Sequence, residues 1–183
     1  MYDKAIELNP DSAFAHSDKG NMLIQLKKYE EALNCVNRAL RIMPDFVFAW
    51  LNKGKILSEL EDFKEALNCF DQALKIDHKE LNVLLSKGKT LHKSGNFKGA
   101  IKCYDRAIRL HPKDSSFWTF KGITLVKLGE HKKAVKSFEK ALKINPDDDN
   151  ARRNRRMVIQ YQNRYQNKKY AKEISKIDKI SPI

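Results

Sequence analysis

Apolar residues recur along this chain at the spacing of amphipathic helices, and they come in pairs of runs. Residues 48–60 form one run and residues 63–76 form the next. The apolar positions are Trp50, Ile56, Leu57 and Leu60 in the first run and Ala66, Leu67, Phe70 and Leu74 in the second. This is the spacing of one helical face, so each pair of runs predicts a helical hairpin. One hairpin cannot bury its own apolar face, and we expect neighbouring hairpins to supply each other's core.

The hairpin returns with a period of 34 residues. The columns that keep this period are Gly20, Gly54, Gly88 and Gly122; Ala32, Ala66, Ala100 and Ala134; Ala39, Ala73, Ala107 and Ala141; Leu23, Leu57, Leu91 and Leu125; Val36, Phe70, Tyr104 and Phe138; and Pro44, His78, Pro112 and Pro146. The glycine lies in the first predicted helix and the alanines lie in the second. We therefore expect the two helix axes to approach closely, near the short end of the ~8–10 Å range. A bulky residue at Gly88 or Ala100 is expected to force them apart.

These columns resemble the tetratricopeptide repeat, whose signature runs W-x2-L-G-x2-Y, then A-x3-F, then P. Trp50 and Trp118 hold the tryptophan position, whereas His16 and Leu84 depart from it. A lysine replaces the leucine before each glycine, and we expect its stem to pack while its ammonium reaches water. The resemblance implies an all-α fold, a right-handed superhelix of antiparallel helical hairpins. It also implies a scaffold or adaptor that binds another protein, and no enzymatic activity.

The repeat boundaries follow from the columns. Four complete repeats are predicted, at residues 13–46, 47–80, 81–114 and 115–148. Residues 1–12 resemble the second helix of a preceding repeat, so the chain begins inside a repeat. Two explanations stay open: the chain was cut from a longer array, or the half-repeat is a native N-terminal cap.

The segment after the last repeat cannot form a further hairpin. Residues 149–172 have a helical composition, but Arg156 stands where the glycine belongs and Lys168 stands where the alanine belongs. We predict a basic C-terminal capping helix there, of the kind that solvates the end of a repeat array. Residues 173–183 form a short isoleucine-rich tail with an apolar stripe. The hypothesis for this tail is a contact with the groove of its own array or of a second copy, which would inhibit the site or dimerise the chain.

The net charge of +13 is concentrated at the C-terminal end, where residues 150–183 carry +8. This excess attracts acidic protein, nucleic acid or anionic lipid, and its alternative explanation is a solvated helix with no ligand. The first alternative function is therefore nucleic-acid binding by the capping helix, through Arg152, Arg153, Arg155 and Arg156 with nearby tyrosines for stacking. The second is self-association, through the ends of the array or the tail.

The residues that carry chemistry elsewhere do not form a catalytic pattern here. Cys35, Cys69 and Cys103 are three copies of one column, so we expect them roughly 10 Å apart, beyond the ~7 Å Cα limit of a disulfide. Free thiols are typical of a cytoplasmic protein. The histidines fall at unrelated repeat positions, and the sequence predicts no metal site and no cofactor. No apolar run reaches the ~18 residues of a membrane span.

The resemblance implies that the first helix of each hairpin lines a concave peptide groove. The candidate contact residues there are Phe14, Asn21, Phe48, Asn52, Lys55, Lys89, His92, Lys93, Phe120, Ile123 and Lys127, continued on the capping helix by Arg153, Asn154, Met157, Gln160 and Tyr161. Apolar side chains alternate with cations, which predicts a partner peptide of apolar and acidic character. The alternative is that Leu51, Leu85 and Phe120 pack against the adjoining helix, and that His92 only faces solvent.

One subclass of these repeats holds the carboxylate end of chaperone tails with asparagines and cations. This chain matches the asparagines at Asn21 and Asn52 but has Ser17, Asn82 and Ser86 where the cations belong. A clamp for two carboxylates needs its cations. We therefore predict no binding to chaperone C-terminal tails, while the two asparagines remain candidates for hydrogen bonds to a ligand's main chain.

Overall fold

The computed structural model describes the backbone of residues 2–177 and the side chains as far as Tyr165. This part of the chain contains ten helices and no strand, so the predicted all-α class is confirmed. The helices are α1 (Tyr2–Leu8), α2 (Ala13–Gln25), α3 (Tyr29–Ile42), α4 (Val47–Glu59), α5 (Phe63–Ile76), α6 (Leu81–Lys93), α7 (Phe97–Leu110), α8 (Ser115–Lys127), α9 (His131–Ile144) and α10 (Asp149–Ile177).

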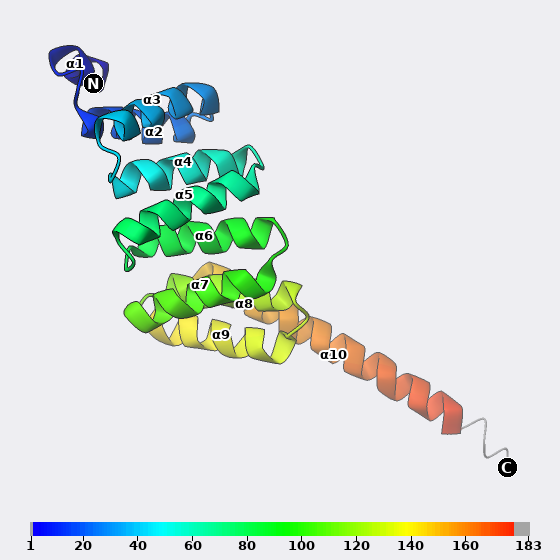
Figure 1. Ribbon diagram of the computed structural model, residues 1–183. Coiled ribbons are helices and arrows are strands. Elements are labelled where there is room, and N and C mark those ends of the chain that lie inside the picture. Colours follow the sequence, from blue (N-terminus) through cyan, green and yellow to red (C-terminus); the bar gives the residue numbers. More distant parts are fainter. Residues whose placement is uncertain (1, 178–183) are drawn as a thin grey trace. The chain divides into compact units, whose positions relative to one another are not determined.

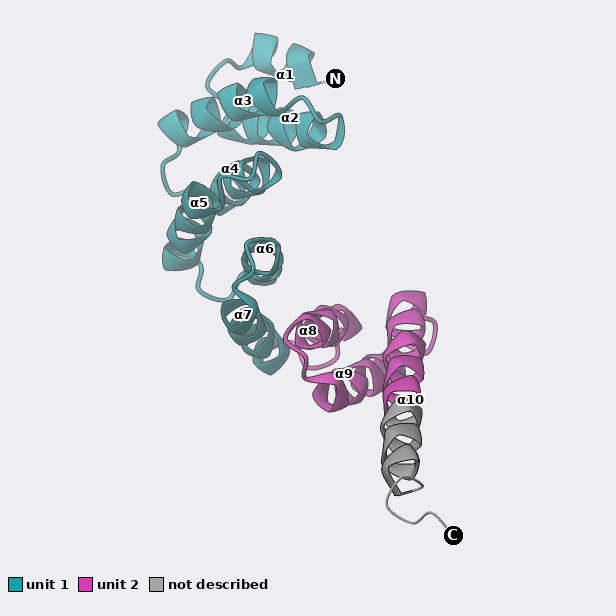
Figure 2. Cartoon of the chain, turned by 90° about the vertical axis from the view of Figure 1, so that its right-hand side faces the viewer, with its two compact units in different colours: residues 1–110 teal, residues 111–183 magenta. Residues whose placement is uncertain are grey.

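The helices fall into two compact units (Figure 2). Unit 1, Met1–Leu110, contains α1 to α7, and unit 2, His111–Ile183, contains α8 to α10. Within unit 1, α2 pairs with α3, α4 with α5 and α6 with α7, and each hairpin also packs on the next one (Figure 1). Within unit 2, α8 pairs with α9, and α10 packs mainly on α9. Each unit is therefore held by the same two kinds of contact, within a hairpin and between neighbours.

Each hairpin is closed by the contact between its glycine and the bulky residue of its second helix. A Cβ atom added to Gly20 would lie 2.5 Å from Val36, and one added to Gly88 would lie 2.5 Å from Tyr104. Gly54 and Gly122 meet a phenylalanine of the second helix in the same way. The alanine columns are completely buried beside these contacts. The expected close approach of the two helices is therefore present in all four hairpins.

In three of the hairpins, the first helix also donates a side-chain hydrogen bond to the loop that precedes it. Trp50 Nε1 donates a hydrogen bond to the Pro44 carbonyl at 2.8 Å, and Trp118 Nε1 donates to the Pro112 carbonyl at 3.4 Å. His16, which departs from the tryptophan signature, makes the same contact from Nε2 to the Pro10 carbonyl at 2.9 Å. The side chain at this position therefore serves as a donor to a loop carbonyl, and histidine replaces tryptophan without loss of that bond.

The two remaining junctions use arginine for the same purpose. Leu84 has no donor, and the carbonyl of His78 is instead bonded by Arg106 Nη2 from α7 at 2.5 Å. On α10, Arg152 occupies the tryptophan position and Arg152 Nη2 donates to the Pro146 carbonyl at 2.5 Å. The loop carbonyl therefore accepts a side-chain hydrogen bond at both junctions, although neither has the tryptophan of the signature.

In two of the hairpins of unit 1, the lysine before the glycine forms an ion pair with the preceding helix. Lys19 Nζ lies 2.5 Å from Asp3 Oδ1, and Lys87 pairs in the same way with Asp71. The stems are partly buried, as expected, and each ammonium lies at an exposed position, where it also pairs with a carboxylate that the sequence analysis did not predict. In unit 2, Arg155 Nη2 continues the column and lies 3.1 Å from Glu139 Oε1. The sequence separation is 16 residues in every case, so this cation column is a repeated ion pair between neighbouring helices.

The start of the last helix is held by two hydrogen bonds to one carboxylate. Asp148 accepts a hydrogen bond from the Ala151 amide at 2.9 Å through Oδ1 and one from Thr119 Oγ1 at 2.8 Å through Oδ2, which ties the start of α10 to α8. Ala151 and Val158 are buried beneath it. α10 continues to Ile177, beyond the predicted end at residue 172. The predicted apolar stripe of the tail falls on side chains outside the described residues, as does the backbone from residue 178 onward.

We expect Gly88→Val to lower the free energy of unfolding by roughly 1–3 kcal/mol, because the added atoms overlap the ring of Tyr104 in a packed core. Urea denaturation followed by circular dichroism measures the change. Gly99→Ala is the matched control, because Gly99 also lies in a helix but its nearest contacts are to the flexible side chain of Asn96. Equal stability of Gly88→Val and the control would contradict the packing argument.

The turn inside each hairpin has a left-handed residue at the same repeat position, with φ of +58° at Lys27, +63° at Glu61 and +80° at Gly95 and Gly129. A side chain is strained in this conformation and glycine is not. Glu61→Gly is expected to raise the free energy of unfolding by about 0.5–1 kcal/mol, and Gly95→Ala to lower it by about 1 kcal/mol. The same denaturation measurement tests both, and shifts of the same sign in the two variants would refute the explanation.

Candidate functional site

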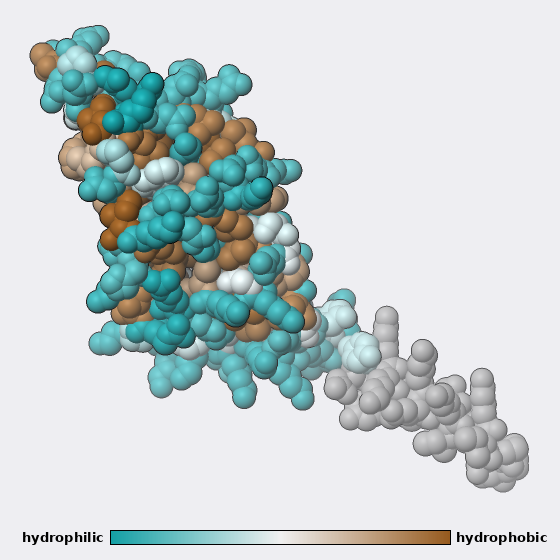
Figure 3. Space-filling view, viewed as in Figure 1, coloured by the Kyte–Doolittle hydropathy of each residue, from teal (hydrophilic) through white to brown (hydrophobic). Residues whose placement is uncertain are grey.

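An exposed aromatic surface lies at the start of α2 and α4 in unit 1. Phe14 is 60% exposed and Phe48 is 49% exposed, and the buried ring of Phe46 lies between them. The centroids of Phe14 and Phe46 are 4.8 Å apart, and those of Phe46 and Phe48 are 6.2 Å apart. Phe14 and Phe48, both predicted contact residues, are thus brought together on one rigid support. Figure 3 shows apolar patches between hydrophilic side chains on one face of the molecule.

A row of lysines follows on α4 and α6 of the same unit. Burial lowers the pKa of Lys55, and the nearby charge of Lys89 lowers it further. Burial likewise lowers the pKa of Lys89, with a second contribution from Lys93. Lys93 Nζ is 2.7 Å from Glu59 Oε1. The row therefore combines mutual repulsion with partial desolvation, and the attraction of an added carboxylate would favour the charged form of these lysines.

Asn52 has a structural role in this arrangement. Its side chain is buried, and Asn52 Nδ2 donates to the carbonyl and the hydroxyl of Ser17, each at 3.3 Å. Asn21, the other predicted asparagine, is exposed. Leu51 is buried in a core cluster with Phe70, which agrees with its alternative role in packing. Neither Asn52 nor Leu51 is part of the exposed surface.

The other predicted groove residues divide between the two units. His92 of unit 1 is half-buried, and its ring centroid lies 5.3 Å from that of Phe97. In unit 2, Phe120 and Ile123 are half-buried on α8, and Lys127 is exposed at the end of this helix.

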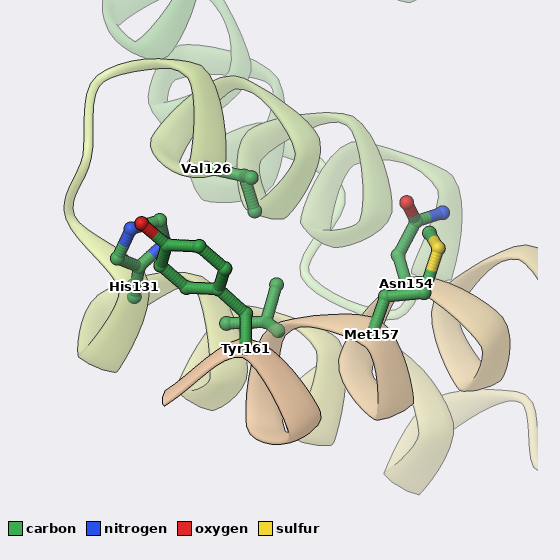
Figure 4. Close-up of a pocket in the computed structure, with 6 residues that line it drawn as sticks. Val126, His131, Asn154, Met157 and Tyr161 are labelled. Carbon is green, nitrogen blue, oxygen red and sulfur yellow. The ribbon is translucent and has the colours of Figure 1, made fainter. Parts of the chain in front are cut away.

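Unit 2 contains an apolar pocket of about 350 Å³, shown in Figure 4. Val126 enters it from α8, His131 from the start of α9, and the remaining walls come from α10. The lining residues are Val126, His131, Asn154, Met157, Val158 and Tyr161. Asn154, Met157 and Tyr161 belong to the predicted continuation of the groove, and the structure brings all three together.

His131 is the residue of this pocket that sequence reasoning missed. Its Nδ1 atom is buried and has no hydrogen-bond partner within the described part of the chain. Its ring centroid lies 5.2 Å from that of Tyr161. Met157 and Tyr161 remain 53% and 57% exposed, so the apolar walls are open to a ligand. A buried polar atom without a partner is costly, and a ligand with a hydrogen-bonding group would satisfy it.

A second, more polar pocket of about 330 Å³ shares His131 and Tyr161 with the first. Its other lining residues are Lys132, Gln162 and Tyr165. The two pockets therefore offer apolar contacts on one side of Tyr161 and a cation with an amide on the other.

The arginines at the start of α10 are largely engaged by their own unit. Arg152 Nη1 is 2.5 Å from Asp149 Oδ1, Arg155 pairs with Glu139, and Arg153 Nη2 bonds Asn150 Oδ1 at 3.3 Å. Arg156 is exposed. These pairs reduce the positive charge that the predicted nucleic-acid surface offers to phosphate.

The cysteines are unsuited to nucleophilic chemistry. All three are free, and burial raises the pKa of each thiol, to about 11 for Cys69. A raised pKa keeps a thiol protonated and inert at neutral pH. Within the described residues, no group of three or more His, Cys, Asp or Glu side chains is placed to hold a metal ion.

None of the described helices combines the length and the apolar character that crossing a membrane requires.

Comparison with known proteins gives one family. Sequence models of the tetratricopeptide repeat match residues 13–46, 47–80 and 85–149. No curated protein matches the sequence.

Several solved structures share the fold. YrrB, described as a TPR protein with an unusual peptide-binding site, is 24% identical with a TM-score of 0.68, covering 89% of this chain and 84% of that chain. PilF of Pseudomonas aeruginosa is 21% identical with a TM-score of 0.76, covering 84% and 70%. A thermophilic TPR protein of Thermus thermophilus is 15% identical with a TM-score of 0.75, covering 86% and 87%. At these identities the likeness concerns the fold alone.

Proposed function

The chain belongs to the tetratricopeptide repeat family, and on that premise we propose that it is a scaffold that binds an apolar and acidic segment of a partner protein. Repeats of this family are typically interaction modules without enzymatic activity. The specific proposal concerns two contact surfaces, one in each unit. In unit 1 it is the exposed side of α2, α4 and α6, and in unit 2 it is the pocket bounded by α8, α9 and α10.

The observation that carries the proposal is the pocket of unit 2. Its walls are apolar and its two largest side chains, Met157 and Tyr161, are about half exposed. The lining also includes Asn154 and His131, and the buried Nδ1 of His131 has no hydrogen-bond partner among the described residues. An apolar cavity with few polar groups suits one anchoring side chain of a peptide. The peptide-binding site named for YrrB supports the same kind of ligand here.

The charge around the pocket favours an acidic neighbour to that anchor. Residues 111–165 contain thirteen lysines and arginines and six acidic residues. Lys132 lines the adjoining polar pocket directly. In unit 1, Phe14 and Phe48 on α2 and α4 and the lysine row on α4 and α6 supply apolar and cationic side chains as well. A segment with apolar anchors and acidic side chains fits both surfaces, and the cations would also steer its approach.

The two alternatives receive less support. Nucleic-acid binding by Arg152, Arg153, Arg155 and Arg156 is weakened by the ion pairs that Arg152 and Arg155 already make. Self-association through the tail concerns residues whose side chains lie outside the described part of the chain. We therefore propose partner-protein binding as the function.

The test is selection of twelve-residue peptides from a randomised display library on the intact chain, followed by fluorescence anisotropy with the enriched peptides. We expect enriched peptides to carry an apolar residue close to an acidic one. The double variant Met157→Ala/Tyr161→Ala should weaken pocket-bound peptides about tenfold or more, because each loses its apolar contact. Lys55→Glu/Lys89→Glu should weaken peptides bound to unit 1 by a similar factor.

Lys64→Glu/Lys98→Glu is the matched control, because it makes the same charge change at exposed positions on second helices, away from the proposed surfaces. Circular dichroism confirms that every variant is folded. Peptides without acidic residues, or peptides that bind all variants with equal affinity, would contradict the proposed surfaces. Binding of an oligonucleotide with steep salt dependence, together with an absence of enriched peptides, would favour the capping-helix alternative.

We also expect no saturable binding of chaperone C-terminal tail peptides below about 1 mM. The cations of the clamp are absent from the sequence, and Asn52 is occupied with Ser17. Isothermal titration calorimetry of such a peptide with a free C-terminal carboxylate, against the same peptide amidated, measures the contribution of that carboxylate. A loss of binding on amidation would show that a clamp forms after all.

A further inference from the structure

We propose that unit 1 carries a second, separate docking site, on α3 and α4, which binds a carboxylate side chain of a partner protein between Arg41 and Lys53. The site is distinct from the α2, α4 and α6 surface proposed above, and it rests on a break in the repeated ion pair between neighbouring helices.

The ion pair recurs wherever the residue 16 positions before the cation is acidic and both residues lie in one unit. Asp3 pairs with Lys19, Asp71 pairs with Lys87 and Glu139 pairs with Arg155. Asn37 occupies this position for Lys53, and an amide has no charge to offer. Lys53 therefore lacks the carboxylate that this position supplies elsewhere in the column, and it forms no ion pair within the described residues.

Lys53 is held in place by a neighbouring aromatic ring. Its Nζ atom lies 5.6 Å from the ring centroid of Trp50, within the range of a cation–π contact. The ring is fixed in turn, because Trp50 Nε1 donates to the Pro44 carbonyl at 2.8 Å. The indole face positions the ammonium without neutralising it, so its charge remains available to an anion.

A pocket of about 630 Å³ opens at this position. Its lining residues are Asn34, Asn37, Leu40 and Arg41 of α3 and Trp50 and Lys53 of α4. Two are cations, two are amides and none is acidic. Within the described part of the chain, Arg41 makes no ion pair, and neither amide side chain makes a hydrogen bond. The pocket thus gathers donors that have no acceptor.

The chemistry of the occupant follows from the rest of the column. Wherever an acidic residue is present within the same unit, the cation of this column pairs with a carboxylate. Arg41 adds the planar guanidinium that suits a carboxylate, and Leu40 and Trp50 add apolar contacts for the neighbouring residues of a peptide. We therefore assign the site to an aspartate or glutamate of a partner segment that is flanked by apolar residues.

The test uses the intact chain labelled with ¹⁵N and the probe acetyl-Leu-Glu-Phe-amide. The indole N–H of Trp50 reports binding in a two-dimensional NMR spectrum, and that of Trp118 is the internal control, because Trp118 lies in unit 2 and the proposed site lies in unit 1. We expect saturable shifts at Trp50 with a dissociation constant on the order of 1 mM, weak because a single exposed ion pair contributes little. The glutamine analogue of the probe should not bind.

Asn37→Asp is the decisive variant, because it supplies the missing carboxylate from within the chain. We expect it to weaken the probe about fivefold or more and to raise the melting temperature by about 1–3 °C. Arg41→Gln should also weaken the probe, whereas Arg109→Gln, at the same repeat position of α7, should not. These variants change exposed or half-exposed side chains, and thermal denaturation monitors their folding.

Several outcomes would overturn the proposal. Equal binding of the glutamate and glutamine probes would show that the site does not recognise a carboxylate. Shifts at Trp118 as large as those at Trp50 would show that the probe does not bind a specific site. A higher melting temperature for Asn37→Asp with unchanged probe affinity would show an internal ion pair but no docking site. Binding restricted to a phosphoserine probe, acetyl-Leu-phosphoserine-Phe-amide, would reject the carboxylate assignment.

Discussion

In each of the four hairpins, the contact between a glycine of the first helix and a bulky side chain of the second fixes the distance between the two helices. A Cβ at Gly54 would lie 2.6 Å from the ring of Phe70, so the two backbones are as close as the ring allows. This proximity buries the alanine columns completely and leaves the opposite side of the first helix outside the hairpin. Which side chains can meet a partner is therefore decided by packing before any recognition chemistry is considered.

The junctions between hairpins depend on polar contacts more than the repeat signature suggests. A side-chain donor meets the loop carbonyl at five junctions, from His16, Trp50, Arg106, Trp118 or Arg152. What the junction requires is a donor at one place in space, and residues from different helices can supply it. This explains why His16 and Leu84 can depart from the tryptophan signature while the stack continues.

Most of the fold could be predicted from the sequence, because the 34-residue period records burial directly. The close contacts at Gly88 and Gly122 could be predicted because the glycine column and the bulky-residue column lie on facing sides of two paired helices. The burial of Asn52 could not be predicted, because its partner Ser17 lies one whole repeat away and its environment depends on how two hairpins pack. The ion pairs of the lysine column could not be predicted for the same reason. Its position predicted a partly buried stem, but its carboxylate partner lies 16 residues earlier, on a different helix.

The candidate sites were harder to predict, because the 34-residue period identifies residues that pack and not residues that bind a ligand. Residues that keep the period hold the array together, so they are the same in each copy and cannot distinguish one ligand from another. Recognition must depend on positions where the copies differ. His131 and Asn37 are both of this kind, one at the first position of a second helix and one in an otherwise acidic column. Each leaves a polar group without its partner among the described residues: the ring nitrogen of His131 in one case and the ammonium of Lys53 in the other. In both proposals, a ligand supplies at such a break what the neighbouring repeat does not.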